Sequence, residues 1–307
     1  GLLKNIRIEL AGKAEMVFNK EVREVMAGPD GVKGVRTSDG EEYSARFVVL
    51  CPGRSGADWL QRLAKAVGLD VAINPIDIGV RVEVPASVLS QATDVMHEAK
   101  LLYSSKRFDD PVRTFCMNPY GIVVRENHPG FSTVNGHSFS TKKSGNTNFA
   151  ILVSTTFTEP FHEPIAYGEY IARLANLLGE GILVQRLGDL QHGRRSTRDR
   201  IEKGSVKPTL ADAVAGDLSF AIPYRHLSDI LEMIEALDKF APGINSPSTL
   251  LYGVEVKFYS VRLKLSDALE TGIKNLFAAG DGAGVTRGIM QESASGIVAA
   301  REIVRRA

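Results

Sequence analysis

The sequence predicts an α/β protein whose first domain is interrupted by a region of α+β type. Residues 47–50 form an unalternated apolar run that ends at a glycine turn, the pattern of a strand buried on both faces. Residues 276–303 read as an apolar strand, a glycine-rich turn and a helix. From about residue 70 the pattern changes to alternating strands and amphipathic helices joined by polar loops. We therefore expect one domain from 1–69 with 261–307, and a second domain inserted at 70–260.

The first domain is expected to open with a helix followed by a β-meander. The helix covers 2–10, and apolar and β-branched residues predict strands over 15–18, 22–26, 32–36 and 43–50. Turn residues separate the strands, with glycines that allow the positive φ angles of tight connections. An apolar stripe then predicts a helix over 59–67 that ends at Gly68.

The inserted domain is expected to combine short strands with amphipathic helices. Alternation predicts strands at 80–84, 121–125 and 150–154. One helix carries an apolar stripe of Tyr170, Ile171, Leu174, Leu177 and Leu178. Another carries Ile230, Leu231, Ile234 and Leu237, with Ser228 as the expected N-cap. Both stripes are expected to face the core.

The composition argues against several classes of function. Among 307 residues, 37 are basic and 36 acidic, so a formal net charge of +1 offers little attraction for nucleic acid or an anionic membrane. No apolar run approaches the ~18 residues of a spanning helix, and no basic-then-apolar leader is present, so a cytoplasmic location is expected. Cys51 and Cys116 make neither a disulfide framework nor a metal site. We expect no nucleic-acid partner, no membrane partner and no metal.

The glycine-rich turn near the C-terminus is the strongest candidate for a ligand site. Its glycines leave backbone open to a ligand, and the following helix directs free N–H groups toward it. The carboxylate of Asp281, directly after the strand, can accept hydrogen bonds from sugar or ribityl hydroxyls. Three interpretations compete: a loop that only packs a helix on a sheet, a dinucleotide or methyltransferase-type nucleotide loop, and the closing flavin motif of an FAD enzyme. The second requires G-x-G-x-x-G, whereas the spacing from Gly282 to Gly288 is G-x-G-x-x-x-G.

Residues 276–303 resemble the C-terminal FAD segment of flavoproteins with two dinucleotide-binding domains. More closely, FVVLCPGRSG at 47–56, IGVRVE at 78–83 and GDGAGVTRGI at 280–289 resemble the FAD-dependent dehydrogenase family of uncharacterised microbial flavoproteins. The resemblance implies an FAD-binding Rossmann-like domain with a β-meander, and an inserted domain with a mixed or antiparallel sheet and helices. It also implies that FAD is contacted by Gly53, Arg54, Gly280, Asp281, Gly282, Gly284, Thr286, Arg287, Gly288 and Ile289. Of these, Thr286, Arg287 and Ile289 would line the isoalloxazine ring together with Gln291.

One feature of that family has no counterpart in the sequence. The family opens with a strand, G-x-G-x-x-G and a helix, which hold the FAD pyrophosphate, and no such segment occurs among the 307 residues. The Rossmann-like domain is therefore expected to be incomplete, in a fragment that lacks the N-terminal G-x-G-x-x-G unit. We expect FAD to be absent or weakly bound in this chain, although its parent protein binds it.

The resemblance implies an FAD-dependent oxidoreductase, a dehydrogenase or reductase whose flavin accepts or donates hydride. A small-molecule substrate would enter between the two domains, with NAD(P)H as a candidate electron donor, and an oligomer is compatible with the sequence. Two alternatives remain: a flavoprotein acting in RNA modification, and a non-catalytic fragment unable to hold FAD.

No residue is assigned a catalytic role. Cys51 could be a redox thiol near the flavin, although a small buried residue at a strand end is favoured. His137 and His226 could donate protons, or be ordinary surface or core histidines. The run at 193–200 contains four arginines that could bind a carboxylate or phosphate, or form a solvated loop, which is slightly favoured. Arg81 and Glu83 share one face of a strand and either project to solvent or pair with neighbours.

Overall fold

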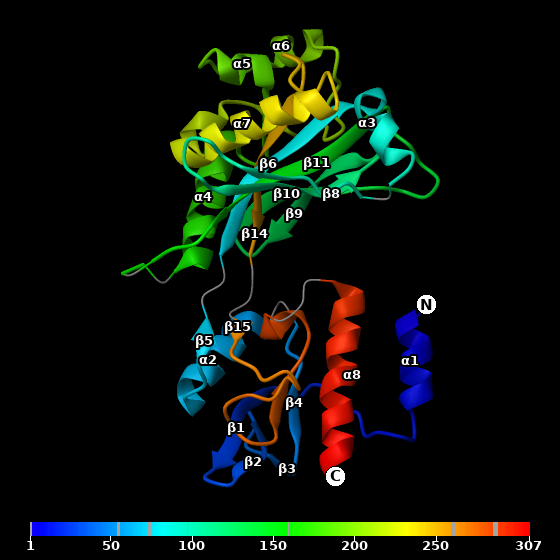
Figure 1. The fold of residues 1–307 in the computed structure, drawn as a ribbon, viewed down its shortest axis with the longest axis vertical. Helices are drawn as coiled ribbons and strands as arrows, with labels where there is room; N and C mark the ends of the chain where they lie inside the picture. Colours follow the sequence, from blue (N-terminus) through cyan, green and yellow to red (C-terminus); the bar gives the residue numbers. More distant parts are fainter. Residues whose placement is uncertain are drawn as a thin grey trace. The chain divides into compact units, whose positions relative to one another are not determined.

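In the computed structural model, the chain forms two compact units (Figure 1). The structure describes residues 2–53, 56–72, 75–96, 98–158, 160–161, 163–258, 262–284 and 288–307. Unit 1 is Gly1–Asn74 with Ser260–Ala307, and unit 2 is Pro75–Tyr259. The predicted boundary at residue 70 falls earlier than this division, because Val71 and Leu263 are partners in a short antiparallel pair that belongs to unit 1.

The first part of unit 1 is a helix and a β-meander. The elements are α1 (Leu2–Leu10), β1 (Val22–Gly28), β2 (Gly31–Thr37), β3 (Glu42–Ser44), β4 (Val48–Leu50), α2 (Ala57–Val67) and β5 (Val71–Ala72). Strands β1, β2 and β3 form an antiparallel sheet in that order. Helix α2 ends as predicted at Gly68, which has a φ of 70° and donates its N–H to the carbonyl of Ala64.

Two strand predictions in this part were wrong. Residues 15–18 are not a strand, and residues 43–50 do not form one continuous strand. The segment divides because β3 pairs with β2 whereas β4 pairs with a strand near the C-terminus. Of the run expected to be buried on both faces, Leu50 is 5% exposed but Val49 is 40% exposed.

The second part of unit 1 returns at the C-terminal end of the chain. It consists of β15 (Arg262–Leu263), β16 (Leu276–Ala278), the 3-10 turn η3 (Asp281–Ala283) and α8 (Ile289–Arg306). Strand β16 pairs with β4 in parallel, joining segments more than 200 residues apart in the chain. A small core that includes Leu50, Leu60, Leu63 and Leu276 lies beneath these elements.

Unit 2 is built on a mixed, mainly antiparallel sheet of seven strands in the order β13-β12-β14-β6-β11-β8-β7. The strands are β6 (Ile76–Pro85), β7 (Leu102–Ser104), β8 (Pro111–Asn118), β11 (Asn146–Thr155), β12 (Leu183–Arg186), β13 (Val214–Ala215) and β14 (Leu250–Lys257). A hairpin of β9 (Ile122–His128) and β10 (Phe131–His137) forms a second sheet. The helices are α3 (Ala86–Thr93), α4 (Pro164–Gly179), α5 (Leu187–Gln191), α6 (Arg198–Lys203), the 3-10 turn η2 (Leu218–Phe220) and α7 (Tyr224–Phe240). The α/β class with a mixed-sheet inserted region is thus confirmed.

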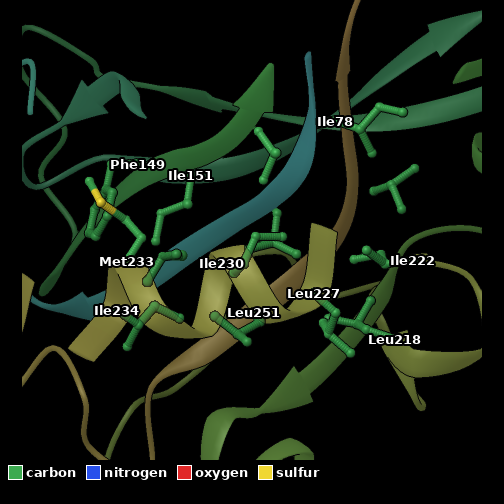
Figure 2. Close-up of a cluster of buried hydrophobic side chains, with 14 of the residues drawn as sticks. Ile78, Phe149, Ile151, Leu218, Ile222, Leu227, Ile230, Met233, Ile234 and Leu251 are labelled. Atoms are coloured by element: carbon green, nitrogen blue, oxygen red, sulfur yellow. The ribbon is translucent and has the colours of Figure 1, made fainter. Parts of the chain in front are cut away.

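Helix α7 lies across one face of the large sheet, and the side chains between the helix and the sheet form the main hydrophobic core of unit 2 (Figure 2). Ile230, Met233 and Ile234 are at most 1% exposed and belong to one cluster with Ile78 and Ile151 of the sheet. The predicted stripe of α7 therefore faces the core, although Leu231 is only partly buried.

The N-cap predicted for this helix was wrong. Helix α7 begins at Tyr224, after Pro223. Ser228 lies within its second turn, where its hydroxyl donates to the carbonyl of Tyr224 at 2.9 Å. Pro223 occupies the N-cap position without a side-chain cap, so this helix begins without the capping hydroxyl that the prediction assumed.

The predicted core stripe of α4 was also wrong. Of its members only Ile171 is buried, and Tyr170 and Leu177 are 74% and 79% exposed. The face that packs on the sheet carries small residues instead, including Gly168, Ala172 and Ala175. A β-carbon on Gly168 would come within about 3 Å of Val256, so the helix approaches the sheet too closely for larger side chains.

Candidate functional site

The candidate site lies where β4 and β16 end side by side. Their parallel pairing places Leu50 opposite Ala278, and the N–H of Ala279 donates to the carbonyl of Leu50 at 3.0 Å. Both strands therefore end at one edge, and the turns that follow them, at 51–53 and 279–284, lie next to each other. The carboxyl edge of parallel strands is the usual ligand-binding edge of an open α/β sheet.

Gly282 lies where the two turns touch. A β-carbon built on it would lie 2.6 Å from the backbone nitrogen of Gly53 and 2.8 Å from the ring of Pro52. Its φ is not positive. Gly282 is therefore required by contact between the turns, and not by a left-handed backbone. This differs from the expectation that it leaves the backbone open to a ligand.

Gly53 and Gly280 have the properties expected at a ligand-facing turn. Their φ angles are 67° and 81°, a region that favours glycine, and a β-carbon on either would meet no atom of the described residues within 4 Å. Gly284 ends η3 with a φ of 70°. Gly288 has an extended φ of −153°, and a β-carbon there would meet only the flexible amide of Gln291. Gly288 is thus not demanded by the backbone.

A serine that the sequence did not single out holds the glycine turn to α8. The hydroxyl of Ser295, 7% exposed, accepts a hydrogen bond from the N–H of Gly280 at 2.9 Å and donates to the carbonyl of Glu292 at 2.7 Å. One N–H of the turn is therefore used within the protein and is not available to a ligand. A serine on the buried face of an otherwise amphipathic helix was the signal that could have revealed it.

The other end of α8 is fixed by charged groups. Arg306 lies 2.6 Å and 2.9 Å from the two carboxylate oxygens of Glu270, and Arg46 donates to the carbonyl of Arg306 at 2.7 Å. The helix N-terminus follows Gly288, whose carbonyl accepts the first helical hydrogen bond, from Glu292 at 2.8 Å. An anchored helix presents its first N–H groups in a fixed direction.

Some of the remaining predicted cofactor residues lie among the described residues and the others do not. Asp281 begins η3 and is half-buried, while Ile289 is 79% exposed and Gln291 is exposed on the first turn of α8. The predictions for Arg54, Thr286 and Arg287 lie outside the described residues.

Cys51 is exposed, which contradicts the expectation of a buried strand-end residue. Desolvation of its sulfur raises the pKa of the Cys51 thiol, and a hydrogen bond with the backbone of Ala279 offsets part of that rise. A thiol with a raised pKa is protonated near neutral pH, so it lacks the activation typical of redox or nucleophilic cysteines.

Arg81 and Glu83 are fully buried in the sheet of unit 2 and pair with neighbours. Arg81 lies 3.3 Å from Glu255, with both side chains 0% exposed, and donates to Asn148 at 2.9 Å. Glu83 accepts a hydrogen bond from the hydroxyl of Thr209 at 2.6 Å. Alternate residues of β6 face the core under α7, so these polar side chains point to the opposite face, where Arg81 meets Gly136 of β10.

The two candidate histidines differ in environment. His137 is exposed and its ring contacts Phe139 edge-on. His226 is 4% exposed, its Nε2 lies 2.9 Å from the Thr155 hydroxyl, and burial lowers its pKa to about 4. Within the described ranges, neither lies in a group of three or more residues able to hold a metal. No described helix is both long enough and apolar enough to span a membrane.

A groove in unit 1 lies away from the glycine turns. It measures about 780 Å³, and its described lining residues lie on or near β1 and α2, including Arg23, Trp59 and Arg62. None of them belongs to the turns at 51–53 or 279–284. We assign the candidate site from the turn geometry instead of groove size.

The fold and the paired turns define an α/β protein with a glycine-rich turn at the carboxyl edge of two parallel strands. A family model described as "FAD-dependent protein, C-terminal domain-like" matches residues 75–258, and the chain belongs to this family. The chain is also 28% identical over 329 aligned residues to an uncharacterised protein of Clostridium beijerinckii. That alignment covers all of this chain and 60% of the relative, so the chain spans about three fifths of the relative's length.

Several solved structures are similar to this chain at low sequence identity and low TM-score. A probable FAD-dependent monooxygenase of Pseudomonas aeruginosa, pqsL, is 14% identical with a TM-score of 0.35, covering 99% of this chain and 60% of that one. The tryptophan 5-halogenase MibH is 13% identical with a TM-score of 0.32, covering 99% and 36%. GidA of Aquifex aeolicus is 17% identical with a TM-score of 0.30, covering 96% and 45%. Likeness of this degree carries no conclusion about activity.

The described turns fit the flavin end of FAD. The open space beside Gly53 and Gly280 leaves backbone accessible, and the Asp281 carboxylate adjoins it in the chain. Helix α8, anchored at Ser295 and Arg306, supplies an N-terminus after Gly288. Together they form the kind of turn that a polar, planar cofactor can approach closely.

Proposed function

We propose that this chain forms the flavin end of the cofactor site in an FAD-dependent oxidoreductase. The observation that carries the proposal is the parallel pairing of β4 with β16, which brings Gly53 and Gly280 to one strand edge with open space at both. Membership of a family of FAD-dependent proteins supports FAD as the ligand of that edge.

Each residue of the site has a distinct task in this proposal. Gly53 and Gly280 let the ligand approach the backbone, and the carboxylate of Asp281 accepts hydrogen bonds from the ribityl hydroxyls. Ser295 holds the turn in place through the N–H of Gly280. Gly282 keeps the two turns in contact. When bound, FAD supplies the hydride and electron transfer, so the protein is required mainly to orient it and exclude competing reactions.

The substrate is proposed to be a small molecule, with NAD(P)H as electron donor. The exposed, protonated Cys51 thiol gives no reason to place a nucleophile or redox thiol in the reaction. We therefore assign no catalytic residue of the chain.

The test is a titration with FAD followed by the quenching of flavin fluorescence, using this chain and a longer protein that contains it. We expect the longer protein to be yellow and to bind FAD tightly, and this chain to bind it weakly, because the G-x-G-x-x-G turn that holds the pyrophosphate in resembling enzymes has no counterpart here. A colourless longer protein that also fails to take up added FAD would contradict the proposal.

A further inference from the structure

A cluster of arginines surrounds one buried carboxylate in unit 2. Asp189 of α5 is 1% exposed, and Arg194, Arg200 and Arg186 lie 2.9, 3.5 and 3.9 Å from its oxygens. The Ser196 hydroxyl donates to the same carboxylate at 2.8 Å. One negative charge thus faces three positive charges, so the cluster carries a net positive charge. Contact with the carboxylate also restricts the positions of the three arginine side chains.

The segment that carries these arginines is fixed to the large sheet. Ser196 donates its N–H to the carbonyl of Gly216 at 2.9 Å, and its hydroxyl accepts the N–H of Arg186 at 2.9 Å. Thr197 caps α6 by accepting the N–H of Arg200. The expectation of a solvated loop therefore holds only for the outward side chains, because the backbone is part of the folded unit.

Positive charge is concentrated in the segment around these arginines. The net charge of the whole chain, +1, does not reveal this concentration. Residues 186–207 contain seven basic and three acidic residues, so they carry a formal charge of +4, and the rest of the chain carries −3. Arg195, Arg198, Lys203 and Lys207 are all exposed, and Arg198, whose side chain is 89% exposed, lies 2.9 Å from the exposed carboxylate of Glu202. The prediction that nucleic acid is not a partner rested on the total charge of +1, which averages over this separation.

The cluster occupies one end of unit 2 (Figure 1). Helix α5 joins the beginning of β14, where the N–H of Leu187 donates to the carbonyl of Thr249 at 2.8 Å. The chain enters and leaves unit 2 at the other end of the strands, where Lys257 is paired with Asp77. The length of β14, at ~3.3 Å per residue, separates these two ends of the sheet by roughly 23 Å.

We propose that the α5–α6 surface, from Arg186 to Lys207, binds the phosphate backbone of a double-stranded nucleic acid without reading its sequence. Exposed cations spread along a rigid segment match a row of phosphates, whereas a single small anion would need them to converge on one point. No aromatic residue occurs between 186 and 207, so the surface lacks the stacking platform that single strands require. The proposal is independent of the flavin site.

The test is fluorescence anisotropy of a labelled DNA duplex and a labelled RNA duplex across a series of salt concentrations. The triple variant Arg195→Gln, Arg198→Gln, Lys203→Gln removes outward charges and leaves the three arginines around Asp189 in place. If the three cations each contact one phosphate, the negative slope of log K against log salt is smaller in magnitude by about 2.7 in the triple variant. Between 50 and 200 mM salt, the affinity of the parent chain should therefore decrease by a factor about 40 times larger than that of the variant. The control Lys100→Gln, Lys106→Gln, Lys142→Gln removes three exposed charges elsewhere in unit 2.

The expected result is duplex binding that the control retains and the triple variant loses, with unchanged thermal unfolding of both. Each of three outcomes would overturn the proposal: no duplex binding at low salt, equal weakening by the control, or tighter binding of an oligothymidylate than of the duplex. Equal binding of poly-glutamate would overturn it as well, since that would indicate an acidic protein surface as the partner. Inorganic phosphate that displaces the duplex at constant ionic strength would indicate a single-anion site instead.

Discussion

Strand β6 of unit 2 and strand β4 of unit 1 differ in how their polar and apolar neighbours are arranged. In unit 2, β6 is buried on both faces, with an apolar core on one side and the Arg81–Glu255 pair on the other. In unit 1, β4 pairs with β16, and Val49 remains 40% exposed. Ligand-binding regions are often drawn from the less stable parts of a protein. The proposed cofactor turns thus lie on the unit with the smaller core.

The largest effect is expected from breaking the buried ion pair of unit 2. Arg81→Ala breaks a buried ion pair and removes a large, fully buried side chain, although Lys257 still lies 3.0 Å from Glu255, and it should reduce the free energy of unfolding of unit 2 by about 3–5 kcal/mol. Urea unfolding followed by circular dichroism measures it. The matched control Arg173→Ala, an arginine 45% exposed in the same unit, should cost about 1 kcal/mol or less. Equal losses would show that the buried pair does not distinguish the units.

Two buried groups should make the stability of unit 2 depend on pH, and their effects have opposite signs. Burial raises the pKa of Asp229 to about 6, so its contribution to stability is present below pH 3.8 and is lost as the pH rises through 6. Burial lowers the pKa of His226 to about 4, so its contribution is present above pH 6.5 and is lost as the pH falls toward 4.

Asp229→Asn removes the first of these dependences, because the amide stays neutral at every pH. The variant should gain stability relative to the parent as the pH rises from 4 to 7, by at most about 3 kcal/mol. Thermal unfolding at a series of pH values measures this difference, and the exposed Asp94→Asn serves as control. A difference that does not change with pH would mean that Asp229 is ionised throughout.

In unit 1, the contribution of Asp281 should appear in ligand affinity. Asp281→Ala removes the proposed acceptor for ribityl hydroxyls and should weaken FAD binding to the longer protein by about 1.5–3 kcal/mol. Fluorescence titration measures the dissociation constant. Asp267→Asn, also in unit 1 but outside the turns, provides the control. An unchanged constant for Asp281→Ala would mean that the ribityl contact is misplaced.

The contact between the two turns can be tested through Gly282. Gly282→Ala places a β-carbon against the backbone of Gly53, so unit 1 should lose about 1–3 kcal/mol of stability and bind FAD less well. Gly296→Ala, within α8, is the matched control. A β-carbon at this position meets no described atom within 4 Å, and the higher helix propensity of alanine should stabilise unit 1 by about 1 kcal/mol. Scanning calorimetry distinguishes the two, and a neutral Gly282→Ala would contradict the described contact.

The smallest expected effect concerns Ser295. Ser295→Ala removes one hydrogen bond to the N–H of Gly280, which should cost about 0.5–1.5 kcal/mol. FAD affinity should fall by a similar amount if the turn must be held for binding. Ser293→Ala, on the same helix but exposed, should leave affinity unchanged. A loss of stability without loss of affinity would restrict Ser295 to a structural role.

Local patterns predicted the parts of this molecule that depend on nearby residues. The α/β class, the strands near β1, β2, β9 and β11, and the end of α2 at Gly68 follow from alternation, apolar stripes and glycine conformation. The glycine turn after β16 was likewise visible, because four glycines and an acid within nine residues exceed what a packing loop needs.

Features that depend on distant segments required the tertiary structure. The division of 43–50 into β3 and β4 depends on β16, and the need for glycine at 282 depends on Gly53. The stripe of α4 turned outward because small residues let the opposite face approach the sheet. Arg81 could not be placed from the sequence, since the partners that offset the cost of burying its charge, Glu255 and Asn148, lie 174 and 67 residues away in the chain. Sequence periodicity reports which residues share a face, whereas the three-dimensional partners decide which face is buried.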